Sequence, residues 1–248
     1  MPEVEHDPGP DSTWGQLFQS APLDHYINFP KSPFHTRFGP VFYRGRLDGT
    51  ARVLVIGQDP STDEILAHRI LAGQAGQLIQ TFLTKLGLTH SYLMLNTFLF
   101  GIQSAALNQK IATDATIMAY RNQLFDQVHA SNSLSAVLAF GSYAHLSATN
   151  WAGRGSLTVV QLTHPTSPSG VAANWNSQFA AAKSVIAPDP DGTVDSTPFS
   201  TTGPIQSTDV PRRDLPFGVP AWQGAGGGTH SQRGAGSNFE SQILWTAP

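Results

Sequence analysis

From residue 51 onward, the chain alternates short apolar runs with longer stretches in which apolar residues recur at helical spacing. The first run, Val53-Leu54-Val55-Ile56, is continuous and mostly β-branched, which is typical of a parallel strand buried on both faces. Comparable runs predict three further strands. These are Tyr92 to Asn96, Ala136 to Phe140 and Leu157 to Leu162.

Amphipathic stretches separate these predicted strands. Apolar residues from Leu78 to Leu86 recur on one helical face, and Gly87 is expected to end this helix. Further helices are predicted at about Thr113 to Ala130, Tyr143 to Ala148 and Ala172 to Ile186. The alternation predicts an α/β fold, a three-layer αβα sandwich with a central four-stranded parallel sheet and right-handed crossovers.

The pattern divides the chain into three parts. Residues 1–50 read as an irregular N-terminal wrap, apart from a short helix from Ser12 to Ser20 capped by Asp11 or Ser12. Residues 51–187 form the predicted domain. Residues 188–248 contain eight prolines and nine glycines, so a disordered tail is expected. Two apolar islands in this tail, 215–222 and 239–245, are candidates for docking onto the domain.

Composition excludes several kinds of chemistry. Apolar residues make up 40% of the 248, enough for a sizeable core. There is no cysteine, so disulfides, thiolate nucleophiles, cysteine-ligated zinc and iron–sulfur clusters are excluded. The histidines show no metal-ligand spacing, and we expect neither a metal nor a cofactor. We also expect a cytoplasmic protein with no membrane partner, because the start is not a signal peptide and no run could span a bilayer.

The charge balance argues against a protein that binds nucleic acid mainly by neutralising phosphates. The formal net charge is −3, with 14 Lys and Arg against 17 Asp and Glu. Five of these cations lie in one 22-residue stretch, which could be either a solvated face or loop or a small phosphate-contacting patch. They are Lys31, Arg37, Arg44, Arg46 and Arg52.

Three polar residues stand where predicted strands end. Asp59 follows the first strand within Gly57-Gln58-Asp59-Pro60, Asn96 ends the second strand, and His164 follows the fourth. Taken singly, each is also typical of a turn, a cap or a structural histidine. Because the carboxyl ends of parallel strands share one edge of a sheet, we expect the three side chains to lie together and to form a site.

The motifs resemble those of the uracil-DNA glycosylase superfamily. Gly57-Gln58-Asp59-Pro60, Leu93 to Thr97, and His164-Pro165 match its best-known family, and Ala139 to Ala144 matches that family's third strand and turn. The stretch Leu71 to Leu78 instead resembles the iron–sulfur branch, whose four cysteines this chain lacks. Coverage runs from about residue 50 to 187.

The resemblance implies a role for each matching residue. Asp59 would stabilise the sugar cation and orient water, while His164 would donate a hydrogen bond to uracil O2. Asn96 would read the uracil edge, since its carboxamide complements N3–H and O4. Gln58 would bind the base through its backbone amide. The loop after His164 would contact DNA through Pro165, Thr166, Ser167, Pro168 and Ser169.

The chain departs from the family pattern at three positions. Ser61 stands where a Tyr normally blocks the thymine methyl group, and Leu71 stands where a Phe stacks on the base. Pro168 replaces the Leu that wedges into the duplex. Phe98 to Lys110 contains neither His nor Arg, so we expect turnover rather than covalent trapping of DNA.

The sequence therefore predicts a monomeric base-excision repair enzyme. It would flip deoxyuridine out of single- or double-stranded DNA and hydrolyse its N-glycosidic bond, which releases uracil and leaves an abasic site. Two alternatives remain open. One is a glycosylase for another deaminated or mismatched base, suggested by Ser61 and Leu71. The other is a catalytically idle nucleic-acid-binding module.

Overall fold

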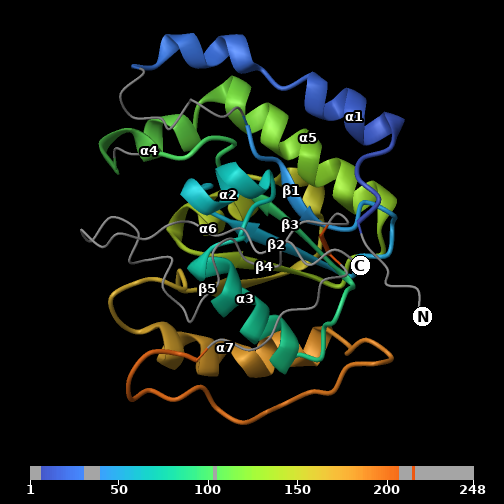
Figure 1. Cartoon of the computed structure of the whole chain (residues 1–248), viewed down its shortest axis with the longest axis vertical. Coiled ribbons are helices and arrows are strands. Elements are labelled where there is room, and N and C mark those ends of the chain that lie inside the picture. Colours follow the sequence, from blue (N-terminus) through green and yellow to red (C-terminus); the bar gives the residue numbers. More distant parts are fainter. Residues whose placement is uncertain (1–6, 31–39, 103–104, 207–213, 216–248) are drawn as a thin grey trace.

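A computed structural model describes residues 7–30, 40–102, 105–206 and 214–215. Its centre is a five-stranded sheet in the order β1-β3-β2-β4-β5 (Figure 1). Four strands are parallel and β1 runs antiparallel to β3. The strands are β1 (Tyr43–Gly45), β2 (Val53–Gly57), β3 (Tyr92–Asn96), β4 (Ala136–Phe140) and β5 (Thr158–Leu162).

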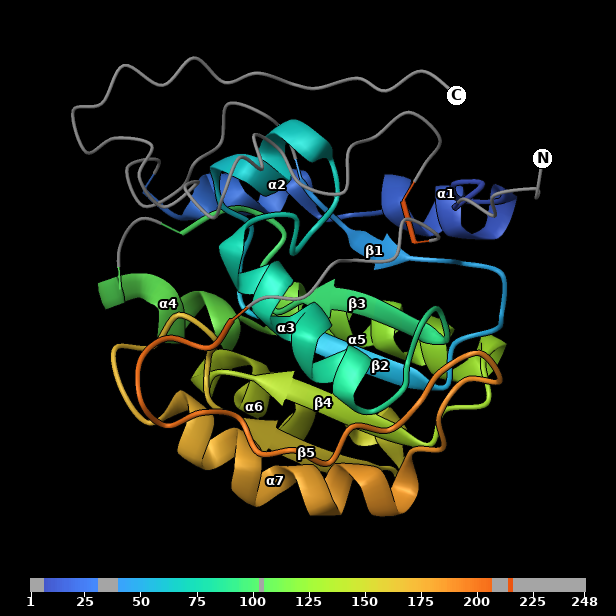
Figure 2. The same cartoon turned by 60° about the horizontal axis from the view of Figure 1, so that its bottom comes forward.

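Helices cover both faces of the sheet, as the α/β prediction requires (Figures 1 and 2). On one face lie α1 (Ser12–Gln19), α4 (Ala105–Ala112), α5 (Ala115–Ser131) and α6 (Ser142–Thr149). On the other lie α3 (Gln74–Lys85) and α7 (Val171–Val185). The remaining short helices are α2 (Thr62–Ala67) and two 3-10 turns, η1 (Leu23–Asn28) and η3 (Ala152–Arg154).

Alternate residues of the central strand enter separate cores. In β2, Leu54 and Ile56 join the core beneath α5, while Val53 and Val55 join the core beneath α3 and α7. All five β2 residues are buried. This burial on both faces is why the apolar run predicts the strand so well.

The αβα sandwich is confirmed, with one more strand than expected. β1 was not predicted, because three residues are too few to show a period and its pairing partner lies about fifty residues away in sequence. The expectation of an irregular wrap over residues 1–50 therefore needs correction, since this segment supplies α1, η1 and a sheet edge. The α1 helix begins as expected, with the Asp11 carboxylate accepting from Trp14 N–H at 2.9 Å.

The expectation of a disordered tail from residue 188 is wrong for residues 188–206, which pack against the domain (Figure 1). Phe199 is buried and stacks on Phe82 of α3, with ring centroids 6.0 Å apart. Its backbone also makes two hydrogen bonds with the Asn176 carboxamide. Leu215, in the first apolar island, is buried as well. The second island, 239–245, lies outside the described residues.

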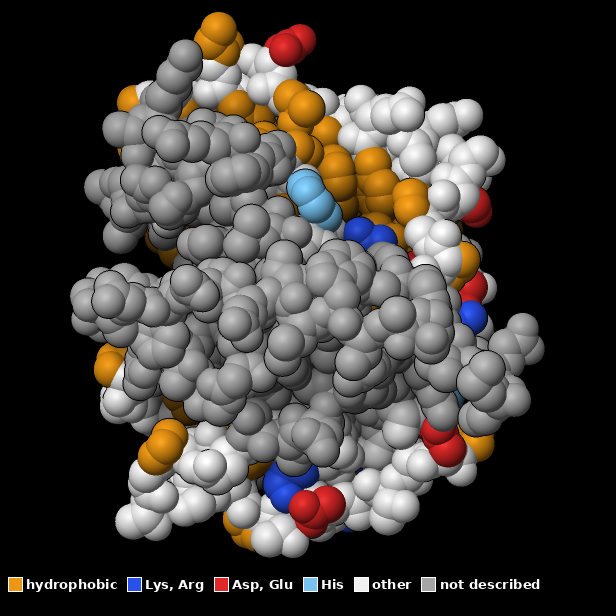
Figure 3. Space-filling view, in the orientation of Figure 1, with side chains coloured by type: hydrophobic (Ala, Val, Ile, Leu, Met, Phe, Trp, Pro, Cys, Tyr) orange, Lys and Arg blue, Asp and Glu red, His pale blue; other side chains and the backbone are white. Residues whose placement is uncertain are grey.

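Among the described members of the basic stretch, Arg46 and Arg52 are partly exposed and lie outside the strands, as expected for a solvated loop, whereas Arg44 is not. Arg44 is fully buried in an ion pair with Asp214, and Arg46 and Arg52 pair with Asp48 and Asp189. Lys31 and Arg37 lie outside the described residues. On the face shown in Figure 3, the described Lys and Arg side chains form no continuous patch. Within the described residues, no helix is long and apolar enough to cross a membrane.

Asp189 fastens the tail to the amino-terminal edge of the sheet. Its carboxylate accepts from Arg52 at 2.6 Å, from the Ser91 hydroxyl at 2.5 Å and from the Thr89, His90 and Ser91 N–H groups. Burial raises the pKa of Asp189, but these hydrogen bonds outweigh it and hold the pKa well below the usual 3.8.

Replacing this carboxylate tests how firmly the tail is held. Asp189→Asn should lower the free energy of unfolding at pH 7 by about 2 kcal/mol, because charge-assisted hydrogen bonds are lost. A depressed folded-state pKa gives stability that is complete above the unfolded pKa and lost as pH falls through the folded value. Denaturant titrations from pH 7 down to pH 2 should therefore show a flatter loss of stability below pH 4 in the variant. Equal slopes in the two proteins would contradict this.

Candidate active site

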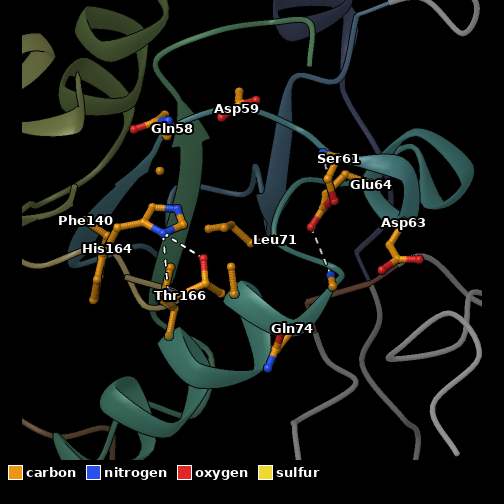
Figure 4. Close-up of a pocket in the computed structure, with 14 residues that line it drawn as sticks. Gln58, Asp59, Ser61, Asp63, Glu64, Leu71, Gln74, Phe140, His164 and Thr166 are labelled. Atoms are coloured by element: carbon orange, nitrogen blue, oxygen red, sulfur yellow. Dashed lines mark hydrogen bonds between the residues drawn. The ribbon is translucent and has the colours of Figure 1, made fainter. Parts of the chain in front are cut away.

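A pocket of about 330 Å³ opens at the carboxyl ends of the parallel strands (Figure 4). Gly57 ends β2, Phe140 ends β4, and His164 follows β5. Six of the residues that the sequence proposed for a site line this pocket. They are Gln58, Asp59, Ser61, Leu71, His164 and Thr166.

The segment carrying Gln58 and Asp59 is held by continuation of the β2–β3 pairing beyond the strands. Thr97 donates to the Gly57 carbonyl through both its N–H and its hydroxyl, and Phe98 N–H donates to the Gln58 carbonyl at 2.9 Å. The Asp59 carboxylate in turn accepts from Ile102 N–H at 3.0 Å. These bonds fix the turn, so its functional groups are positioned before any ligand arrives.

Asn96 lies behind Gly57 and does not line the pocket surface. Its side chain is 4% exposed, and both carboxamide atoms are buried without a hydrogen-bond partner in the described part of the chain. A Cβ atom on Gly57 would lie 2.3 Å from Asn96 Oδ1, so only glycine permits this approach. A buried polar group without a hydrogen bond costs about 1–3 kcal/mol of stability. A ligand that hydrogen-bonds to this carboxamide would remove that cost.

His164 is positioned by its own loop and by Gly141. Its Nδ1 lies 3.1 Å from the Thr166 hydroxyl and accepts from Thr166 N–H at 3.4 Å, which leaves the proton of a neutral ring on Nε2 (Figure 4). Gly141 has a φ of +99°, and a Cβ there would lie 3.2 Å from His164 Cβ. Burial lowers the pKa of His164 below the usual 6.5. The ring therefore enters the pocket as a neutral donor.

Leu71 adopts a left-handed conformation, with a φ of +54°. Arg44 donates to its carbonyl at 2.6 Å. The start of α3 also approaches this carbonyl so closely that a Cβ on Gly76 would lie 1.6 Å from it. Gly76, the second glycine of the Gly-x-Ala-Gly pattern after Leu71, is thus required by packing.

Glu64 is a pocket residue that the sequence reasoning missed. It is 4% exposed, and its carboxylate accepts from the Ser61 N–H at 3.0 Å and hydroxyl at 2.5 Å, and from Gly73 N–H at 2.9 Å. It therefore joins the turn after β2 to the segment after Leu71 (Figure 4). The signal was present, since Ser61-x-x-Glu64 is the pattern of a capping box.

The loop after His164 is only partly available for contact with DNA. Thr166, Pro168 and Ser169 are exposed and Ser167 is half-buried, but Pro165 is buried. Pro165 therefore shapes the loop rather than presenting a surface. Among the described residues that line the pocket, none is a lysine or an arginine.

A family model, the uracil DNA glycosylase superfamily, matches residues 44–189. This chain belongs to that superfamily. The matched region begins at Arg44 of β1 and includes β2 to β5 and every described residue that lines the pocket. Among curated proteins, no relative matches the chain. Membership of the uracil DNA glycosylase superfamily supports a DNA-glycosylase hydrolase that acts in DNA repair, with DNA as its partner.

The electrostatic state of His164 can be measured directly. NMR titration of the imidazole C–H signals, assigned by their absence in His164→Gln, should give a midpoint below 6.5 because charging the ring requires desolvation. Because the unfolded chain binds this proton more readily than the folded chain, the same shift predicts that the free energy of unfolding decreases as pH falls below 6.5. A midpoint at or above 6.5 would contradict a buried neutral ring.

Proposed function

We propose that this protein releases uracil from DNA by hydrolysing the N-glycosidic bond of deoxyuridine. The observation that carries the proposal is the buried, unpartnered Asn96 carboxamide beside Gly57, at the same sheet edge as His164. A carboxamide offers one acceptor and two donors in one plane, which suits uracil N3–H and O4. Cytosine reverses this pattern and would leave the buried atoms unpaired.

The base must leave the duplex before it can reach this pocket. Asn96 is covered in the structure, and Leu71 Cδ1 is close enough to lie 3.5 Å from a Cβ built on Gly57. Entry of the base therefore requires a small displacement of pocket side chains, with Leu71 the nearest candidate. Uracil that pairs with Asn96 would supply the hydrogen bonds that the carboxamide lacks.

Charge separation in the transition state gives the remaining groups their roles. As the glycosidic bond lengthens, positive charge develops on the sugar and negative charge on uracil O2. Asp59 would stabilise the sugar cation and orient the attacking water, while the Nε2–H of His164 would donate to O2. Each of these electrostatic contributions is worth about 3 kcal/mol, because it acts mainly on charge present in the transition state.

A substrate panel tests the reaction and its selectivity. Single- and double-stranded oligonucleotides that carry uracil, hypoxanthine, xanthine or mismatched thymine would be assayed for abasic-site formation at a fixed salt concentration. We expect product from the uracil substrates and at most slow product from the others. Release of another base with uracil left intact would replace the proposed substrate, and absence of any product would identify a binding module.

Three substitutions test the roles of the side chains. Asp59→Asn and His164→Ala should each lower the single-turnover rate of uracil release on the order of a hundredfold, with unchanged thermal unfolding. Asn96→Asp should slow uracil release and admit cytosine, because the donor pattern changes. Near-wild-type rates in the first two variants, or unchanged base preference in the third, would remove the corresponding role.

A further inference from the structure

A buried ion pair joins the strand β1 to a residue far beyond the region matched by the family model. Arg44 Nε lies 2.6 Å from Asp214 Oδ2, and Arg44 Nη2 lies 3.4 Å from Asp214 Oδ1. The side chains are 0% and 1% exposed. Asp214 also accepts from Gly45 N–H through its backbone carbonyl at 3.3 Å. The chain thus returns to the sheet edge at Asp214, after the matched residues 44–189 have ended.

The same arginine holds the wall of the pocket. Its third hydrogen bond, from Nη1, goes to the Leu71 carbonyl at 2.6 Å. Leu71 lines the pocket in a left-handed conformation, which is costly for a residue with a side chain and persists only where the surroundings hold it. A planar guanidinium can hold a carboxylate and a carbonyl in fixed directions at once, so Asp214 orients Arg44 and Arg44 orients Leu71.

Asp214 is surrounded by groups that further restrict its position. Its Oδ2 also accepts from the Tyr92 hydroxyl at 3.1 Å and from Gln80 Nε2 at 3.3 Å. Arg44, Gln80 and Tyr92 are all 0% exposed. Loss of the carboxylate would leave the guanidinium buried without its counter-ion, which strongly favours rearrangement of whatever Arg44 contacts.

A second terminal segment reinforces the same part of the pocket. Asp7 Oδ2 lies 3.1 Å from Arg69 Nη2, and Asp7 N–H donates to the Leu215 carbonyl at 3.0 Å. Arg69 also lies over the Tyr43 ring of β1, at 4.5 Å from its centroid. Both ends of the described chain therefore meet where the segment that leads into Leu71 crosses β1.

We propose that Asp214 is a positioning residue for base excision, acting through Arg44 to hold Leu71 against the flipped base. This rests on the proposed function, because the base pocket is the one assigned there. Asp214 then contributes to the active site although it lies outside the residues matched by the family model.

The test uses the full-length chain and a matched control. Asp214→Asn keeps the shape of the side chain and removes its charge. It should lower the single-turnover rate of uracil release on the order of ten- to a hundredfold at saturating enzyme, as expected for a misplaced pocket wall. Asp189→Asn is the control, because Asp189 is also a buried carboxylate paired with an arginine, but its hydrogen bonds go to Arg52 and to residues 89–91 at the amino-terminal ends of β2 and β3, and none goes to Arg44 or Leu71. It should keep the rate within about twofold.

A double-mutant cycle separates positioning from general destabilisation. If Asp214 acts through Leu71, then Asp214→Asn should cost less than about threefold when it is added to Leu71→Ala, since the group it positions has been removed. Additive effects in the double variant would overturn the proposal. Wild-type rates in Asp214→Asn would overturn it as well.

Two further measurements cover the remaining outcomes. If Asp214→Asn does not fold, the double variant Arg44→Met with Asp214→Leu replaces the ion pair by apolar groups, which proteins often tolerate. This double variant should fold and release uracil more slowly than the wild-type protein, and a wild-type rate would refute the positioning role.

Methyl NMR of Leu71 should show shifts in Asp214→Asn and not in Asp189→Asn. This signal needs no activity, so it decides the link to Leu71 even if the wild-type protein releases no base and the proposed function fails.

Discussion

The central strand β2 is the constraint on which the rest of this structure depends. It is buried on both faces and hydrogen-bonded on both sides, to β3 and to β4. A strand held in this way cannot change register without moving apolar side chains out of two cores. Its end at Gly57 is therefore fixed in space, and so are Gln58 and Asp59, which follow it. The neighbouring strand β3 brings Asn96 to the same edge, and β5, on the far side of β4, brings His164 there.

Around that fixed edge, buried polar groups determine the shape of the pocket. Glu64 binds Ser61 and Gly73, and Arg44 binds Leu71 and Asp214, so each joins two segments that are far apart in sequence. Such groups are stable in the interior only when all their hydrogen bonds are made. Both polar atoms of the Asn96 carboxamide lack a hydrogen-bond partner among the described residues, and this side chain lies where the proposed base would bind. The bonded groups thus shape the pocket wall, whereas the carboxamide can still gain hydrogen bonds from a ligand.

Sequence reasoning succeeded where the signal was local. The parallel strands show themselves as apolar runs, and the polar residues at their ends follow from the topology. It failed where a feature depends on distant partners. The strand β1 has only three residues and exists because it pairs with β3, and Arg44 is buried because Asp214 returns to it. A count of cations along the chain cannot distinguish a buried pair from a surface patch. The packing of Phe199 and Asp189 was not predicted either, because their partners are distant in sequence and composition alone suggested a disordered tail.

The lining of the pocket also favours one direction of charge separation. Asp59, Asp63 and Glu64 line it, and the lining residues that the structure describes include no lysine or arginine. Carboxylates that line a pocket favour positive charge on a sugar and oppose negative charge on a departing base. The neutral His164 ring can offset the second effect, because its Nε2–H can donate a hydrogen bond to O2. The burial that keeps this ring neutral is thus part of the proposed chemistry, and Gly141, which lets the ring approach β4, contributes to it.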